Sequence, residues 1–187
     1  MKQKRKYIQS TKRTICAHAD LFNTAFELFL RGKENKRGSI HLFRASNVFT
    51  AFALEAFLNH AGEEVFSKKW TELERSTPLG KLIILCEKLD IKIDWGESPW
   101  STAKTIFKMR NACAHGRDQT KKERKIITTI DKWYLLEGQW EKLSTEGNVE
   151  RIQKDITKIM EMIWKKLGKN EGILFDIGPQ VTWRGEI

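Results

Sequence analysis

The chain has 187 residues, 40% of them hydrophobic and 10% aromatic, which suits one compact domain with an apolar core and is short for two. Its formal net charge of +10 favours an anionic partner, with nucleic acid ahead of an anionic membrane surface. No uninterrupted apolar run approaches the roughly 18 residues that a membrane-spanning helix needs, so no such helix is predicted.

The first 13 residues form a basic segment. They include six Lys or Arg residues and no acidic residue, a pattern typical of a solvated arm that could touch a polyanion. No apolar stretch with a small-residue cleavage site follows, as a secretory signal would require. We therefore predict a basic N-terminal arm over residues 1–13 and a cytoplasmic protein.

Two helices are predicted in the first third of the chain. Residues 14–31 place apolar side chains at helical spacing, with no interior Pro or Gly. Ser39 is a suitable N-cap for the second helix, which is apolar around most of its circumference and is expected to stop at Gly62. A helix this apolar belongs at the centre of a bundle.

Two prolines mark the starts of the next helices. Pro78 and Pro99 each suit a first helical turn, because proline fixes a helical φ and the N–H that it lacks would be unpaired there. The helices predicted behind them cover residues 79–89 and 100–115. The second of these is expected to end at Gly116.

The last long helix has the most regular pattern. Between residues 149 and 167, isoleucine recurs every three or four positions to form one apolar stripe, and Gly168 provides a stop. The preceding segment, residues 126–143, fits either a helix or extended structure.

Together these segments predict an all-α fold, a bundle of four or five main helices over residues 14–168. The tail, residues 169–187, is expected to pack over the bundle surface or to pair as a short strand. No internal repeat suggests any other organisation.

The three cysteines, Cys16, Cys86 and Cys113, are widely spaced and include no Cys-x-x-Cys pair. This pattern indicates neither a disulfide framework nor a zinc site, and reduced thiols in the core are expected. No metal site and no cofactor are predicted.

The stretch RNACAHG, from Arg110 to Gly116, ends the helix predicted over residues 100–115. Asn111 and His115 are four residues apart and share a helix face, whereas Arg110 lies about 140° round the axis from His115 and about 7.5 Å along it. One rigid helix therefore does not aim Arg110 and His115 at one atom. Either the long arginine side chain wraps round the axis, or a second copy of the helix faces the first and a dimer shares the site.

These residue types suit cleavage of an RNA phosphodiester without a metal. Histidine has an unperturbed pKa near neutrality and can move the protons of the reaction. A planar guanidinium can stabilise charge on the phosphoryl oxygens, and asparagine can position the phosphate. The RNA supplies its own 2′-hydroxyl nucleophile. Cys113 points to nearly the opposite side of the helix from His115, so a thiol nucleophile is not expected.

The motif resembles the Arg-x4-6-His signature, with a polar residue directly after the arginine, of the HEPN superfamily (higher eukaryotes and prokaryotes nucleotide-binding). The order of elements is also HEPN-like: an apolar helix carrying ALEAFLNHAG, a short helix opened by proline, and a helix that enters the motif. The resemblance covers residues 14–167 as architecture. It implies a helical bundle that dimerises so that two motifs line a basic cleft. In many members it also implies metal-independent endoribonuclease activity that leaves a cyclic phosphate and a 5′-hydroxyl.

Residue by residue, the resemblance implies that Arg110 and His115 are the catalytic pair and that Asn111 is their polar neighbour. Glu55 corresponds to an acidic residue that holds the arginine in some members. HEPN toxins that are silenced by nucleotidyl transfer carry a tyrosine two places after the histidine, where this chain has Arg117. The sequence thus gives no support for that form of regulation.

The resemblance also bears on partners. RNA and a second copy of the chain are implied, and because many members act as toxins or in phage defence, an antitoxin or another adjacent-gene protein is a further candidate. The basic residues expected to contact the RNA backbone lie around and after the motif: Lys108, Arg117, Lys121 and Lys122.

Plainer interpretations stay open beside this one. His115 is also a helix C-terminal histidine of the kind that the helix dipole favours. Arg110 could be an ion-paired or snorkelling residue, and its pairing with Glu55 could be purely structural. Trp95 and Trp100 suit loop anchors better than base-stacking platforms. The alternative functions are a non-catalytic RNA- or nucleotide-binding module and a helical scaffold.

Overall fold

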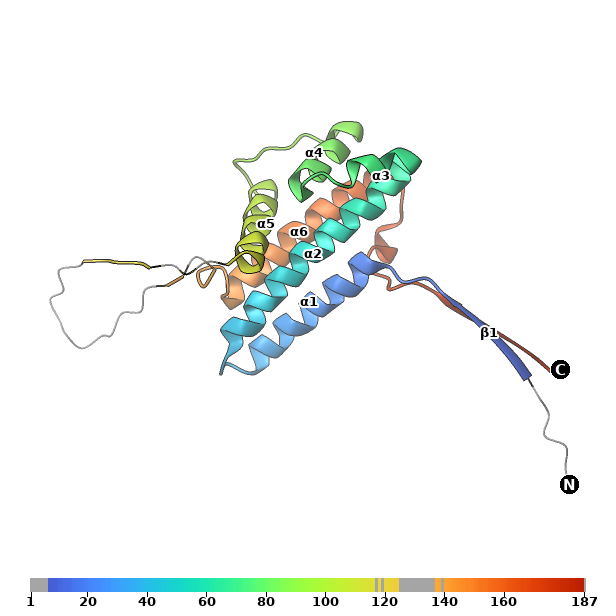
Figure 1. Ribbon diagram of the computed structural model, residues 1–187, viewed down its shortest axis with the longest axis horizontal. Helices are drawn as coiled ribbons and strands as arrows, with labels where there is room; N and C mark the ends of the chain where they lie inside the picture. Colours follow the sequence, from blue (N-terminus) through green and yellow to red (C-terminus); the bar gives the residue numbers. More distant parts are fainter. Residues whose placement is uncertain (1–6, 117, 119, 125–136, 139, 187) are drawn as a thin grey trace, which may run out of the picture.

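The computed structural model describes residues 7–116, 118, 120–124, 137, 138 and 140–186, and Figure 1 shows an elongated helical bundle with a thin ribbon at one end. The elements in chain order are β1 (Tyr7–Arg13), α1 (Ala17–Glu34), α2 (Ser39–Phe66), the 3-10 turn η1 (Ser67–Lys69), α3 (Trp70–Leu73), α4 (Pro78–Lys88), α5 (Trp100–Ala114), α6 (Glu146–Lys166), the 3-10 turn η2 (Glu171–Ile173) and β2 (Gln180–Glu186). The predicted helical bundle is confirmed for these residues, with a two-stranded sheet added to it.

Helix α2 is the centre of the bundle, as predicted. It contacts α1, α4, α5 and α6, and its side chains Leu54, Phe57 and Leu58 are fully buried. A helix that is apolar on most sides gains stability only if neighbours cover all of those sides. Even so, neither α2 nor any other helix within the described residues combines the length and the apolarity needed to cross a membrane.

The predicted end of this helix is wrong. α2 does not stop at Gly62 but continues to Phe66. A Cβ atom added at Gly62 would overlap the ring of Trp70, which is only 1% exposed. The glycine therefore allows close packing of Trp70 against α2 and does not terminate the helix.

Helices α4 and α5 begin where the prolines predict. Pro78 is the first residue of α4, and the Thr77 hydroxyl accepts a hydrogen bond of 3.1 Å from the N–H of Gly80. α5 begins at Trp100, directly after Pro99, and ends at Ala114. The motif therefore lies at the C-terminal end of α5, as the sequence predicts.

Helix α6 buries the predicted isoleucine stripe. Ile152, Ile156, Ile159 and Ile163 are all fully buried in the core that α6 shares with α2 and α5. Gly168 follows the helix with a φ of 71°, the left-handed conformation that ends helices. The 3.6-residue period thus identifies this element and its buried face correctly.

The ribbon joins the two ends of the chain. β1 and β2 are antiparallel, with Tyr7 opposite Glu186 and Arg13 opposite Gln180, and every side chain of β1 is exposed. Figure 1 shows the ribbon extending away from the helices, on the far side of the bundle from the end of α5. The predicted arm is solvated from residue 7 to residue 13, and the structure adds that it supplies the partner strand for the tail.

The tail divides into two parts. Its first part packs on the bundle: Leu174 is 1% exposed, and the ring of Phe175 stacks on Phe22 of α1 with 4.5 Å between centroids. Its second part is β2. Both alternatives that the sequence left open for the tail therefore occur, each in one half.

The segment 126–143 is described only in part. Residues 125–136 and 139 lie outside the described residues, so the choice between helix and extended structure is not settled there. Residues 140–144 form a turn before α6, closed by a 2.9 Å hydrogen bond from the N–H of Ser144 to the carbonyl of Glu141.

Candidate functional site

The candidate site is the C-terminal end of α5. Arg110 and Asn111 belong to the last turn of the helix, and the N–H of His115 still donates to the carbonyl of Asn111 at 2.9 Å. His115 then leaves the helical conformation and is exposed, as is Gly116 after it. The backbone of His115 is thus fixed by this hydrogen bond, and the residue is open to solvent.

Arg110 points toward α2. Its Nη2 donates to Oε2 of Glu55, and the guanidinium lies over the ring of Phe52 with 5.7 Å between its carbon and the ring centroid. Its Nη1 donates to Oδ1 of Asn111 at 2.8 Å. The arginine side chain is only 18% exposed, so this conformation is held from two directions. The contact between Glu55 and Arg110 that the sequence predicted is present.

A second cation, Lys81 of α4, reaches the same carboxylate. Its Nζ lies 3.5 Å from Oε1 of Glu55, and the lysine is 4% exposed. A lysine this buried needs an opposite charge beside it, which Glu55 provides. Lys81 was not predicted as a site residue from the sequence. A usable signal existed, because Lys81 precedes the fully buried Leu85 by four residues and so shares its helix face.

The cluster of Glu55, Lys81 and Arg110 holds two positive charges and one negative charge. The Nε of Arg110 is buried without a hydrogen-bond partner among the described residues. A guanidinium has five N–H donors, and the bonds to Glu55 and Asn111 use two of them. The cluster therefore has an excess positive charge, and the guanidinium has N–H groups that these two bonds do not use.

Asn111 connects the arginine to the exposed side of α5. It accepts from Arg110, and it precedes His115 by four residues on the same helix face. The structure thus brings Arg110, Asn111 and Glu55 together, and it leaves His115 at the helix end in solvent. Part of the 140° between arginine and histidine is spanned because the Arg110 side chain reaches back to Asn111.

Three of the four predicted RNA-contacting residues belong to the part of the chain that the structure describes. Lys108, Lys121 and Lys122 are all exposed, whereas Arg117 lies outside the described residues. Lys121 donates to the carbonyl of Glu137 at 2.7 Å. Lys108 lines a pocket on the side of α5 away from Arg110.

A tryptophan that the sequence did not single out lies near the motif. Trp100 is 6% exposed, and Trp95 packs against the same core, so both are anchors as expected. Trp140 instead lies near the motif, with the Arg44 guanidinium over its ring at 5.6 Å from the centroid. Trp140 was not predicted from the sequence because the hydrophobic pattern of its segment has no clear helical or strand period.

The three cysteines are free thiols, but only Cys86 is buried in the core as predicted, whereas Cys16 and Cys113 are partly buried. Burial raises the pKa of Cys86 to about 12, and burial also raises the pKa of Cys113, although the positive charge of Arg44 opposes that shift. Both thiols are therefore protonated and poorly nucleophilic at neutral pH. Within the described residues, no three or more His, Cys, Asp or Glu side chains gather in a way that could hold a metal ion.

Comparison of the chain with protein-family models, with curated proteins and with solved structures found no match. The resemblance to the HEPN superfamily therefore rests on the residues from Arg110 to Gly116 and on the helical architecture. The contact of Arg110 with Glu55 is compatible with that resemblance and also with a purely structural ion pair.

Proposed function

We propose that the protein is a metal-independent endoribonuclease of the HEPN type. The observation that carries the proposal is the end of α5: a guanidinium held by Glu55 and Asn111, and an exposed His115 four residues after Asn111 on the same helix face. The chain's formal net charge of +10 favours association with RNA. A toxin-antitoxin or phage-defence setting is part of the same proposal.

In the proposed reaction the 2′-hydroxyl oxygen attacks the adjacent phosphorus, and the bond from phosphorus to the 5′-oxygen breaks. The products are a 2′,3′-cyclic phosphate and a 5′-hydroxyl. One proton leaves the nucleophile and one reaches the leaving oxygen, and His115 performs one of these transfers. Arg110 stabilises the negative charge on the phosphoryl oxygens, and Asn111 orients the phosphate.

A homodimer completes this site. A single chain has only one His115, and that side chain is not directed at Arg110 by the helix geometry, so a facing copy would supply the second proton carrier. An apolar surface beside the site supports this arrangement. Phe52 lies under Arg110 and is 39% exposed, and the half-buried ring of Phe49 meets it edge-on. Association of two chains at this surface would cover both rings.

The test is to incubate the purified protein with RNA in excess EDTA. We expect cleavage that His115→Ala and Arg110→Ala abolish, while Lys154→Ala, an exposed change on α6, leaves it intact. Thermal unfolding of each variant verifies folding. Intact RNA at several salt concentrations, or cleavage by both motif variants at the rate of the parent protein, would contradict the proposal.

One observation favours a second candidate, a binding module without catalysis. Arg110 already has a carboxylate and an amide as partners and is largely buried, as expected for an arginine whose role is to hold α5 against α2. This alternative predicts salt-sensitive RNA binding that His115→Ala leaves unchanged, with no cleavage products. Binding and cleavage measured on the same preparation separate the two candidates.

A further inference from the structure

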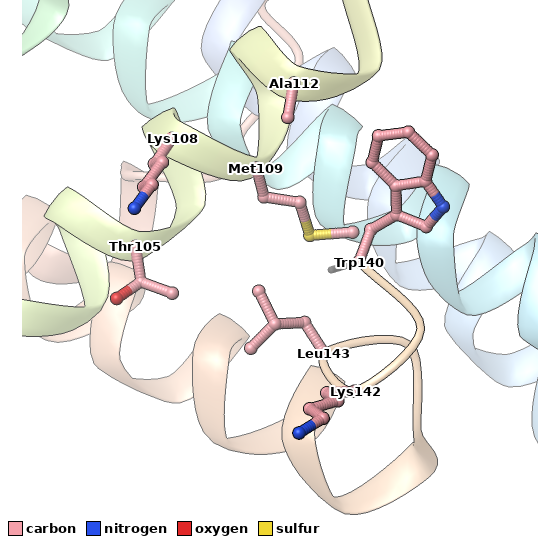
Figure 2. Close-up of a pocket in the computed structure, with 7 residues that line it drawn as sticks. All are labelled: Thr105, Lys108, Met109, Ala112, Trp140, Lys142 and Leu143. Atoms are coloured by element: carbon pink, nitrogen blue, oxygen red, sulfur yellow. The ribbon is translucent and has the colours of Figure 1, made fainter. Parts of the chain in front are cut away.

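A pocket of about 320 Å³ opens on the side of α5 away from Glu55. Figure 2 shows α5 forming one wall and the turn before α6 forming the other, with the Trp140 ring at one end. The residues that line it are Thr105, Lys108, Met109, Ala112, Trp140, Lys142 and Leu143. Its volume suits a small ligand or one unit of a polymer.

Side-chain hydrogen bonds add to the backbone bond that closes the turn forming the second wall. The buried Asn47 of α2 donates through Nδ2 to the carbonyl of Leu143 at 2.9 Å. The hydroxyl of Ser144 donates to the carbonyl of Trp140 at 2.8 Å, and Nδ2 of Asn148 donates to the carbonyl of Lys142 at 2.7 Å. The pocket is therefore preformed, which lowers the entropy cost of binding.

The lining combines apolar walls with positive charge. Met109, Ala112 and Leu143 form an apolar surface beside the Trp140 ring, and Lys108 and Lys142 add two ammonium groups, with no carboxylate among the described residues that line the pocket. A complementary ligand has a flat, weakly polar face and nearby negative charge. A nucleobase with its flanking phosphates has both.

The pocket adjoins the motif. Ala112 directly follows Asn111, and a Cβ atom added at Gly116 would lie 3.9 Å from Cη2 of Trp140. In addition, exposed polar residues follow one line along α5 at spacings of four, three and four: Lys104, Lys108, Asn111 and His115. A nucleic-acid backbone on this line would place a base at the pocket and a phosphate at Asn111 and His115 of the motif.

We propose that this pocket binds the base of a nucleotide next to the phosphate at the α5 motif, with Trp140 as the stacking surface and Lys108 and Lys142 on the phosphates. The identity of the ligand as RNA rests on the proposed function. The pocket would then determine which base the protein prefers at that position, since phosphate contacts carry no sequence information.

The test uses four fluorescent 2′-O-methyl hexanucleotides, one for each base, which lack the nucleophile and so stay intact with the full-length protein. Binding is measured by anisotropy. We expect a preference for one hexamer and a roughly tenfold loss of that affinity in Trp140→Ala. Thr105→Phe, which fills the pocket from its exposed rim, should have the same effect. Trp183→Ala, an exposed tryptophan on β2, is the matched control and should bind as the parent does.

Each outcome decides something. Parental affinity of both Trp140→Ala and Thr105→Phe for all four hexamers overturns the pocket proposal, as does displacement of the hexamers by a short polyglutamate peptide at equal concentration. If these variants bind weakly but the parent cleaves no RNA, the pocket stands and the nuclease proposal fails. If the parent cleaves RNA and Trp140→Ala cleaves it at the same sites and rate, the nuclease proposal stands and the pocket proposal fails.

Discussion

The two sides of α5 place their charged groups in different surroundings. On the side toward α2, Arg110 is held by Glu55, and the buried Lys81 shares that carboxylate. On the other side, Lys108 lines an open pocket that Trp140 also lines. One helix thus has a fixed guanidinium on one side and an accessible pocket on the other. A change on the first side should alter stability and chemistry, and a change on the second should alter ligand binding.

The largest effect is expected at the shared carboxylate. Glu55→Ala leaves Lys81 and Arg110 without their counter-ion, and we expect a loss of about 3 kcal/mol in the free energy of unfolding, at the lower end for a broken buried pair because Glu55 is partly exposed. Urea denaturation measures it. Glu64→Ala is the matched control on α2, since Glu64 also meets two basic groups but near the surface, and should cost less than about 1 kcal/mol. Equal losses in the two variants would show that burial of the cluster adds nothing to the strength of its ion pairs.

The next effect separates the charge of Arg110 from its shape. Arg110→Lys keeps a positive charge near Glu55 but loses the planar fork that also reaches Asn111. We expect the rate of RNA cleavage in EDTA to fall about 100-fold, as for loss of one transition-state donor. Single-turnover rates measure it, and Arg151→Lys on α6 serves as control. A parental rate would mean that Arg110 contributes only its charge.

A smaller effect is expected on the pocket side. Asn47→Ala removes the hydrogen bond that holds the carbonyl of Leu143, which should lower the free energy of unfolding by about 1 kcal/mol. It should also weaken hexanucleotide binding, because the second wall of the pocket is no longer fixed. Asn148→Ala removes a more exposed bond of the same turn and should change both quantities less. Full affinity in Asn47→Ala would argue against a preformed pocket.

The smallest effect concerns the buried histidine, in contrast to the exposed His115. Burial lowers the pKa of His18, whose Nε2 lies 3.0 Å from the carbonyl of Leu174. His18 of the unfolded chain therefore binds a proton at a higher pH than His18 of the folded chain. The stability that depends on neutral His18 is fully present above about pH 6.5 and is lost as the pH falls below that value. Unfolding between pH 7 and pH 5 should show this loss, His18→Gln should reduce it, and the exposed His41→Gln should not. If the free energy of unfolding of His18→Gln depended on pH as strongly as that of the parent, another group would be responsible for the loss.

The bundle could be predicted because its helices carry their own pattern. The isoleucine period of α6 and the apolar circumference of α2 follow from local sequence, and both are buried accordingly. The role of Gly62 depends on Trp70, and the strand at residues 7–13 forms only against residues 180–186. Such contacts between distant segments have no local signal, so the sequence allowed a strand in the tail but revealed neither its partner strand nor the role of Gly62.

The site shows the same division. Glu55 was found because a carboxylate in an apolar helix needs a partner, and Arg110 was the nearest candidate in chemical terms. Trp140 was missed because it enters the site only through the packing of the turn before α6. Lys81 was missed although its spacing to Leu85 places it on the buried face of α4. Residue chemistry predicted the contact of Glu55 with Arg110, and tertiary placement added the second cation and the pocket.

The most direct measurement is the identity of the RNA ends produced in excess EDTA, determined by mass spectrometry. The account predicts a 2′,3′-cyclic phosphate on one product and a 5′-hydroxyl on the other, and neither product with His115→Ala. Products that carry a 5′-phosphate and a 3′-hydroxyl, or cyclic phosphates formed equally well by His115→Ala, would contradict it.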